Sequence, residues 1–220
     1  MASKNELVKC VIVGDSKNDQ LDLLNTIISS NSSNKNQNTE NNTTEMTDIF
    51  DHKELSVNIK NHNYILSFFL PSGNEEYDRV RPLIYQGTDV YIITFEIDNI
   101  YSFSNIKHKW HLEITSNQNI TFIPFILVGL KSETRINNTN TNTNNNNSPR
   151  NLVGRLEAEE LCRDLKGIGY CEFSYIKNEG HNIIINKIIQ YIDKQRYGTG
   201  TGGGNSNEDS DGNGGCCLIG

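Results

Sequence analysis

The sequence predicts an α/β fold: a six-stranded, mostly parallel sheet that contains one antiparallel strand and is flanked by helices. Two observations predict it. Apolar strand-like runs alternate with helix-like segments along the chain, as in open sheets wrapped by helices. The runs at 89–97 and 122–130 are apolar almost throughout, which is typical of parallel strands covered on both faces.

The predicted elements follow one another in a regular order. Strands are expected at 7–14, 51–61, 64–70, 89–97, 122–130 and 170–176, and helices at about 19–29, 75–85, 101–114, 155–165 and 181–196. A turn at His62 and Asn63 joins the second and third strands as a hairpin, which makes one strand antiparallel. Pro82 is expected to end the second helix. Phe103 and Trp110 have the spacing of core residues in the third helix.

Composition divides the chain into one domain and two tails. The strand and helix pattern occupies residues 6–196, preceded by a short tail at 1–5 and followed by an acidic, Gly-rich tail at 197–220. Asn-rich insertions at about 29–45 and 136–150 interrupt the domain where loops are expected. The remaining residues are enough for one domain with a substantial core.

Charge and hydropathy exclude several classes of partner. A net charge of −7 provides no basic footprint for nucleic acid. No apolar run is long enough to span a bilayer, and the first residues lack the apolar stretch of a signal peptide, so a cytoplasmic setting is expected. Cys10, Cys162 and Cys171 are predicted to be small core residues. His108 and His111 have a spacing that permits metal ligation, but a solvated helix face is the expectation.

Two stretches of the sequence resemble one protein family. Residues 75–110, EEYDRVRPLIYQGTDVYIITFEIDNIYSFSNIKHKW, and 125–135, FILVGLKSETR, resemble the Rho/Rac branch of the Ras-like small GTPases. The resemblance extends over roughly residues 6–196. It implies a Ras-like P-loop NTPase fold, GTP or GDP with Mg²⁺ as ligands, and a monomer that binds effector and regulator proteins.

The phosphate loop implied by this resemblance comprises Gly14, Asp15, Ser16, Lys17, Asn18, Asp19, Gln20 and Leu21. Its last three positions should hold Gly, Lys and Ser/Thr, but they hold Asp19, Gln20 and Leu21. Gln20 brings no positive charge, Leu21 has no oxygen for Mg²⁺, and Asp19 adds a negative charge. Losing the Lys alone should weaken nucleotide binding on the order of tenfold to a hundredfold. The alternative is an ordinary strand-to-helix turn.

The first switch of the family corresponds to residues 46–52. Asp48 stands where the family has the Thr that senses the γ-phosphate, and Thr47 lies one residue early. A shift of one residue would bring Thr47 into place. Ile49, Phe50 and Asp51 resemble the entry to the effector-binding strand, although an ordinary edge strand is the alternative.

The second switch reads LPSGN, residues 70–74. Leu70 replaces the Asp that holds the metal, and Asn74 replaces the Gln that orients the attacking water. Gly73 is retained where its backbone would meet a γ-phosphate. These changes predict a poor Mg²⁺ site and loss of GTP hydrolysis, with no catalytic residue assigned.

The motifs that contact the base are better preserved. Lys131 and Glu133 stand in LKSE, where the family has a Lys and an Asp, so Glu133 still offers a carboxylate to guanine on a longer stem. Ser174 matches the last motif of the family, and Tyr175 replaces a small Ala. The alternative is that Lys131 and Glu133 belong to a surface loop.

The C-terminal residues CCLIG resemble a prenylation box. Cys217 is the expected prenyl site, and Cys216 is a candidate for a second acyl chain. A lipid anchor would place the protein on the cytoplasmic face of membranes, with the plasma membrane as the expected one. Gly220 is outside the usual terminal set and leaves the type of lipid open.

Two functions are consistent with these residues. The first is a membrane-anchored, Rho/Rac-like switch that keeps weakened guanine-nucleotide binding. The second is a nucleotide-independent pseudo-GTPase that presents 49–51 and 77–83 to protein partners. An unrelated flavodoxin-like binder would not explain both YDRVRPLIY and CCLIG.

Overall fold

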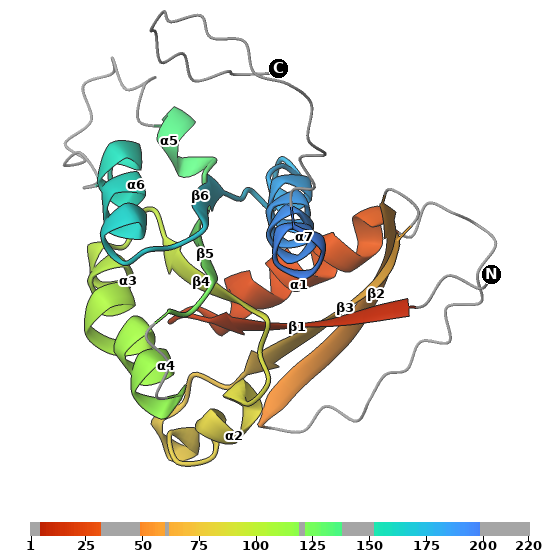
Figure 1. Ribbon diagram of the computed structural model, residues 1–220. Coiled ribbons are helices and arrows are strands. Elements are labelled where there is room, and N and C mark those ends of the chain that lie inside the picture. Colours follow the sequence, from red (N-terminus) through yellow and green to blue (C-terminus); the bar gives the residue numbers. More distant parts are fainter. Residues whose placement is uncertain (1–4, 32–48, 60–61, 119–121, 138–151, 199–220) are drawn as a thin grey trace, which may run out of the picture.

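The computed structural model describes residues 5–31, 49–59, 62–118, 122–137 and 152–198. Within them, one sheet has the strand order β2-β3-β1-β4-β5-β6 (Figure 1). Its strands are β1 (Asn5–Val13), β2 (Phe50–Ile59), β3 (His62–Pro71), β4 (Val90–Glu96), β5 (Phe125–Leu130) and β6 (Gly169–Glu172). β2 pairs with β3 in the antiparallel sense, and the other neighbours are parallel. The predicted six-stranded α/β fold is therefore confirmed.

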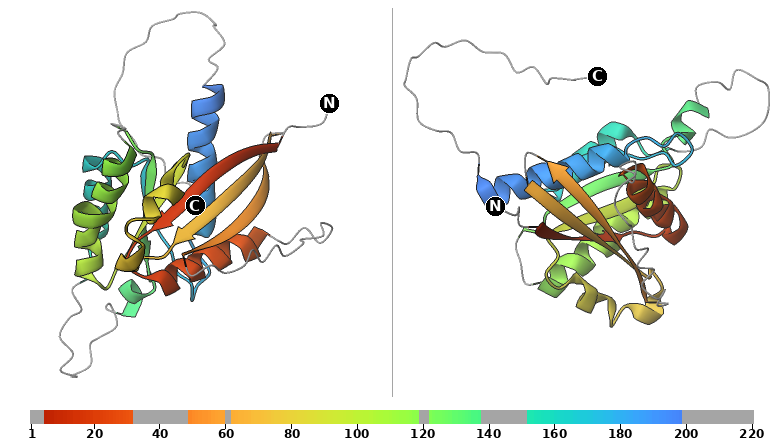
Figure 2. Two further views of the ribbon diagram at one scale, coloured as in Figure 1. Left: turned by 90° about the horizontal axis from the view of Figure 1, so that it is seen from below. Right: turned by 90° about the vertical axis from the view of Figure 1, so that its right-hand side faces the viewer.

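Helices cover both faces of this sheet (Figures 1 and 2). α1 (Lys17–Asn31) and α7 (His181–Tyr197) lie on one face, and α3 (Ile100–Asn105), α4 (His111–Gln118) and α6 (Arg155–Asp164) lie on the other. One hydrophobic cluster joins α1 and α7 to the sheet, and a second joins the other three helices to it. Both faces of β4 and β5 are therefore buried, as their apolar sequences require.

The hairpin and the second helix differ from the prediction. His62 and Asn63 belong to β3, paired with Ile59 and Asn58, so the turn expected at these residues was placed too late. The predicted helix at 75–85 is split into a 3₁₀ turn, η1 (Glu75–Tyr77), and α2 (Arg81–Tyr85). Pro82 lies in the first turn of α2, where a missing N–H costs little. It begins a helix and does not end one.

The third predicted helix is continuous from α3 to α4 through a π-helical turn, η2 (Ile106–Trp110). Phe103 and Trp110 are buried, as predicted. His108 is exposed, but His111 packs edge-on against Phe125 with ring centroids 5.7 Å apart, so a solvated pair was wrong for His111. The short helix α5 (Thr134–Asn137) was not predicted.

The three cysteines outside the tail are core residues, as predicted. Cys10, Cys162 and Cys171 are buried free thiols, and burial raises the pKa of each. Most of the two tails and of the two Asn-rich insertions lies outside the described residues. In the described ranges, no helix has both the length and the apolarity needed to cross a membrane.

Candidate functional site

Four of the predicted motifs meet at one edge of the sheet, where β1, β3, β5 and β6 end. A Cβ added to Gly73 would lie 3.6 Å from the carbonyl oxygen of Gly14. The Lys131 ammonium lies 3.0 Å from Asp19 Oδ2. The N–H of Ser132 donates to the carbonyl oxygen of Phe173 at 3.0 Å, which joins the two base-contacting loops. The phosphate loop, the second switch and both base loops therefore share one site.

The segment aligned with the phosphate loop is already helical at Lys17, earlier than predicted. Ser16 Oγ donates to Asp19 Oδ2 at 2.5 Å, and the Gln20 N–H donates to the Ser16 carbonyl oxygen at 3.1 Å. A phosphate loop directs its N–H groups at the phosphates, but the N–H of Gln20 is used within the helix. Asn18 is exposed in the same turn.

Gln20 stands at the position of the phosphate-binding Lys and points into the protein. Only 2% of its surface is exposed. Its Nε2 donates to Thr94 Oγ1 at 2.8 Å, and Thr94 Oγ1 donates to the Val13 carbonyl oxygen at 3.1 Å. A Cβ on Gly14 would come within 2.7 Å of Gln20 Nε2. The space above Gly14 is therefore filled by a side chain of the protein itself.

Asp19 and Lys131 interact directly across the site. The Lys131 ammonium also contacts Glu96 Oε1, at the end of β4. Burial lowers the pKa of Lys131, but hydrogen bonds to Glu96 and Asp19 outweigh this effect and raise that pKa overall. The Lys that would lie along a guanine base is therefore held between two carboxylates.

The base side contains one polar atom whose hydrogen-bonding capacity is not used by the described residues. Glu133 Oε2 is buried and has no hydrogen-bond partner among the described residues. Ser174 is fully buried. Its Oγ accepts from the Lys177 N–H at 3.1 Å, so this hydroxyl stabilises the loop at 174–177. Tyr175 is 57% exposed. A ligand with N–H donors, such as a guanine base, would satisfy Glu133.

The two positions that would serve Mg²⁺ are hydrophobic. Leu70 is fully buried in the cluster beneath α1 and α7, and Leu21 packs against the same cluster. Mg²⁺ requires oxygen ligands in near-octahedral geometry, so these residues do not fit the ion. Asn74 accepts from the Glu76 N–H at 3.3 Å and caps η1. Its amide is therefore engaged by Glu76.

The predicted effector-strand entry is only partly exposed. Ile49 is 38% exposed, whereas Asp51 is 8% exposed. The Lys17 ammonium lies 3.4 Å from Asp51 Oδ2. The ring of Phe50 lies 5.8 Å from that of Phe69. Asp51 is therefore largely buried and contacts the first turn of α1 through Lys17. Thr47 and Asp48 lie outside the described residues.

Asp15 is anchored to the third helical segment. Trp110 Nε1 and Asn105 Nδ2 each donate to a different oxygen of Asp15, both at 2.7 Å. The Arg81 guanidinium lies over the Trp110 ring, with Cζ 5.4 Å from its centroid. A continuous series of contacts therefore joins the phosphate loop to α2.

Comparison with known families agrees with this geometry. The Ras family model matches residues 9–194. The chain belongs to the Ras family. The match spans the whole described sheet from β1 to α7 apart from a few terminal residues, which confirms the predicted Ras-like fold. Ras-family domains in general bind guanine nucleotides and interact with effector and regulator proteins.

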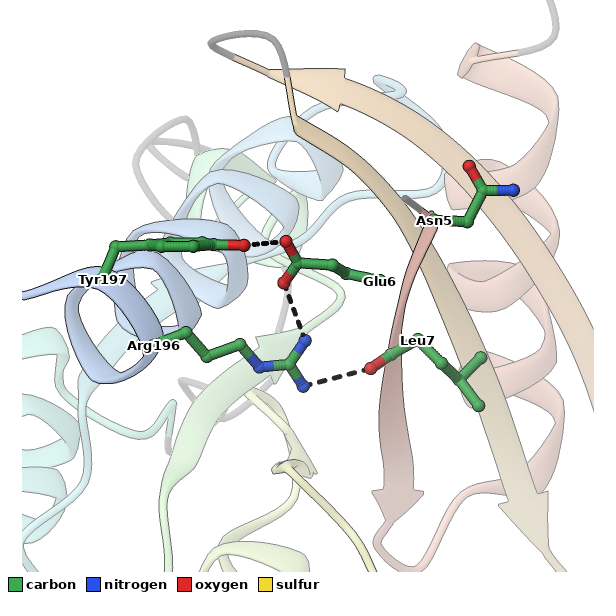
Figure 3. A pocket seen from close by; sticks show the side chains of 5 residues that line it. All are labelled: Asn5, Glu6, Leu7, Arg196 and Tyr197. Carbon is green, nitrogen blue, oxygen red and sulfur yellow. Dashed lines mark hydrogen bonds and ion pairs between the residues drawn. The ribbon is translucent and has the colours of Figure 1, made fainter. Parts of the chain in front are cut away.

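A separate pocket lies at the opposite end of β1 (Figure 3). Its volume is about 390 Å³, and it is lined by Asn5, Glu6, Leu7, Arg196 and Tyr197. Arg196 donates to Glu6 at 3.1 Å and to the Leu7 carbonyl oxygen at 3.0 Å, and Tyr197 donates to Glu6. These contacts hold the end of α7 against β1, far from the family motifs.

Sequence reasoning missed several residues at the candidate site. Thr94 and Glu96 are the polar exceptions in an otherwise apolar strand, a signal that could have identified them. Arg81 is fully buried, but nothing in its sequence context distinguishes it from the exposed Arg79.

Proposed function

We propose that this chain is a Rho/Rac-like signalling protein of the Ras family that has lost GTP hydrolysis and binds guanine nucleotide weakly. The Rho/Rac assignment is supported by Arg81 and Trp110, which both belong to residues 75–110, one of the two stretches that resemble that branch. They contact each other and, through Asp15, the phosphate loop. The residues that characterise the branch therefore form one connected structure.

One observation carries the rest of the proposal. The side chain in place of the phosphate-binding Lys is a buried Gln bonded to Thr94. This Gln is uncharged and does not point toward a phosphate. Affinity for a guanine nucleotide must therefore come from contacts with the base, through Glu133 and the stem of Lys131. Without Mg²⁺ ligands at Leu21 and Leu70, and without Gln at 74, hydrolysis has no supporting group at these positions.

Thermal unfolding of the full-length protein with GTP, GDP, GMP or ATP, each with and without Mg²⁺, tests this proposal. A ligand that binds only the native state raises its stability, by about 2.7 kcal/mol at a hundredfold excess over Kd. We expect a small, guanine-selective rise in melting temperature that Mg²⁺ does not enlarge, and no release of phosphate from GTP. Mg²⁺-dependent phosphate release would contradict the proposal.

A second candidate function is a nucleotide-independent pseudo-GTPase that binds proteins. The specific observation in its favour is the contact between Asp19 and Lys131, which uses a base-side Lys without any ligand. Unchanged melting temperatures at millimolar nucleotide would favour this candidate over the first. Partners would then be sought for the surface at 77–83, where Leu83 is 65% exposed.

We also propose that a lipid on Cys217 attaches the protein to the cytoplasmic face of membranes. Cys217 is followed by two aliphatic residues, and Cys216 could carry a second chain. Two chains matter because one gives only marginal membrane binding. Mass spectrometry of the protein from eukaryotic cells, compared with Cys217→Ser, tests this. An unmodified Cys217 in the wild type would refute it.

A further inference from the structure

Two polar side chains of β4 connect this strand to the first turn of α1. Thr94 and Glu96 are two residues apart, so they project from the same face of the strand. Thr94 accepts from Gln20, and Glu96 accepts from Lys131, which in turn contacts Asp19. Adjacent residues at the start of α1 are therefore connected to β4, one directly and one through Lys131.

The backbone holds Lys131 in this position. Its φ of 63° lies in the left-handed region, which is uncommon for residues other than Gly. Thr134 stabilises that conformation, because its N–H and its Oγ1 both donate to the Lys131 carbonyl oxygen, at 3.0 and 2.7 Å. The ammonium is thus directed at Asp19 and Glu96 by a formed turn.

The charges around the Lys131 ammonium disfavour the binding of an additional anion. Asp19 and Glu96 place two carboxylates against the single ammonium of Lys131. The Asp19, Glu96 and Lys131 side chains are only 22%, 16% and 33% exposed, so solvent screens them less than it screens a surface pair. A polyphosphate bound here would add negative charge beside Asp19 and Glu96, whereas a neutral guanine nucleoside would add none.

We propose that Glu96 determines the ligand specificity of this site: with Asp19 it holds Lys131 as an internal counter-ion and disfavours nucleotide polyphosphates. This inference rests on the proposed weak binding through the base side. Glu96 is a positioning residue, because it acts on the ligand through Lys131. The preferred ligands are guanine compounds with few phosphates, in the order guanosine, then GDP, then GTP.

Calorimetric titration of guanosine, GDP and GTP into the full-length protein tests the proposal. Glu96→Gln keeps the shape of the side chain and removes its charge. We expect the affinity for GDP to rise about tenfold in this variant, the effect of one charge-assisted hydrogen bond, while that for guanosine stays unchanged. Glu159→Gln removes the carboxylate of the exposed pair with Arg155 and should alter neither ligand. Equal changes for GDP and guanosine would overturn the proposal.

A measurement without ligand separates this proposal from the proposed function. Amide hydrogen exchange in ligand-free Glu96→Gln should be faster than in the wild type at residues 17–21 and 131–134, and unchanged in Glu159→Gln. If the wild type binds no guanine compound but Glu96→Gln binds GDP, the proposed weak binding fails and the role of Glu96 is supported. If neither the wild type nor Glu96→Gln binds a guanine compound, the amide exchange decides. Unchanged exchange in Glu96→Gln overturns the role of Glu96, and faster exchange confined to residues 17–21 and 131–134 supports it.

Discussion

The side-chain amide of Gln20 donates a hydrogen bond of 2.8 Å to Thr94 Oγ1, and Gln20 is 2% exposed. This bond places the residue aligned with the phosphate-binding Lys among the side chains that hold α1 to β4. A buried amide is stable only when its polar atoms are paired, and Thr94 provides that pairing from within the protein. At this position the side chain of α1 is therefore paired with Thr94 of β4, whereas the family's Lys is paired with a phosphate of the bound nucleotide.

Replacing Gln20 by Lys should destabilise the protein, although it restores the residue that phosphate binding requires. The new ammonium would lie buried beside Thr94, with no phosphate to pair with it. We expect unfolding free energy to fall by about 3 kcal/mol, as for an uncompensated buried charge. Urea denaturation measures this change. Asn18→Lys adds the same charge at an exposed position of the same turn and should change stability by about 0.5 kcal/mol or less.

Inorganic phosphate should offset part of that loss in Gln20→Lys and have no such effect on Asn18→Lys. A Gln20→Lys protein as stable as the wild type without phosphate would show that the side chain reaches water, contrary to its burial.

Restoring an Asp at Leu70 should be more damaging than restoring the Gln at Asn74. Leu70 is fully buried in the cluster beneath α1 and α7, so Leu70→Asp loses apolar burial and adds an unpaired carboxyl. We expect a loss of about 4 kcal/mol or more, measured by chemical denaturation with and without Mg²⁺. Asn74 is exposed, and Asn74→Gln should stay within about 0.5 kcal/mol of the wild type. A stable Leu70→Asp protein that gains stability from Mg²⁺ would refute this view of the cluster.

The sheet could be predicted from the sequence because its signals are local, whereas the site depends on contacts between distant residues. The run that forms β4 is evident in seven consecutive letters, but the partner of Glu96 is 35 residues away. The sequence Asp19-Gln20 alone is compatible with a Gln20 side chain that is exposed or one that is buried. Only the position of Thr94 on β4 distinguishes them. Pro82 was misassigned for a related reason, since a Pro ends one helix or begins another with the same local chemistry.

Arg81 should prove essential for the conformation of residues 72–80. Its guanidinium is fully buried and donates to the carbonyl oxygens of Ser72 and Asn74, both at 2.9 Å, and to Glu113 at 2.8 Å. Arg81→Met removes all of these hydrogen bonds from the buried guanidinium and should cost about 3 to 5 kcal/mol. Arg81→Lys keeps the charge but cannot reproduce the planar fork, so it should recover only part of the loss.

Arg79→Met is the matched control, because Arg79 is exposed two residues away. Denaturation should show a change of about 0.5 kcal/mol or less for it. Amide exchange should accelerate at 72–80 in Arg81→Met alone. Equal stabilities of the two variants would mean that the buried Arg81 contacts contribute little.

His181 should make the protein less stable in mild acid. It is 5% exposed at the start of α7, and its Nδ1 has no hydrogen-bond partner within the described part of the chain. Burial lowers the pKa of His181 below its ordinary value of 6.5, and the positive end of the helix dipole also disfavours the charged ring. The folded state therefore binds fewer protons than the unfolded state, so stability is complete above pH 6.5 and falls as pH decreases through that value toward the lowered pKa.

The measurement is the change in melting temperature between about pH 7.5 and about pH 5.5, on either side of the His range. We expect a smaller decrease in His181→Gln than in the wild type. The decrease should not vanish, because burial also lowers the pKa of His111. His108→Gln removes an exposed His and should retain the full wild-type decrease. If His181→Gln and His108→Gln respond alike, protonation of His181 is not what destabilises the fold in acid.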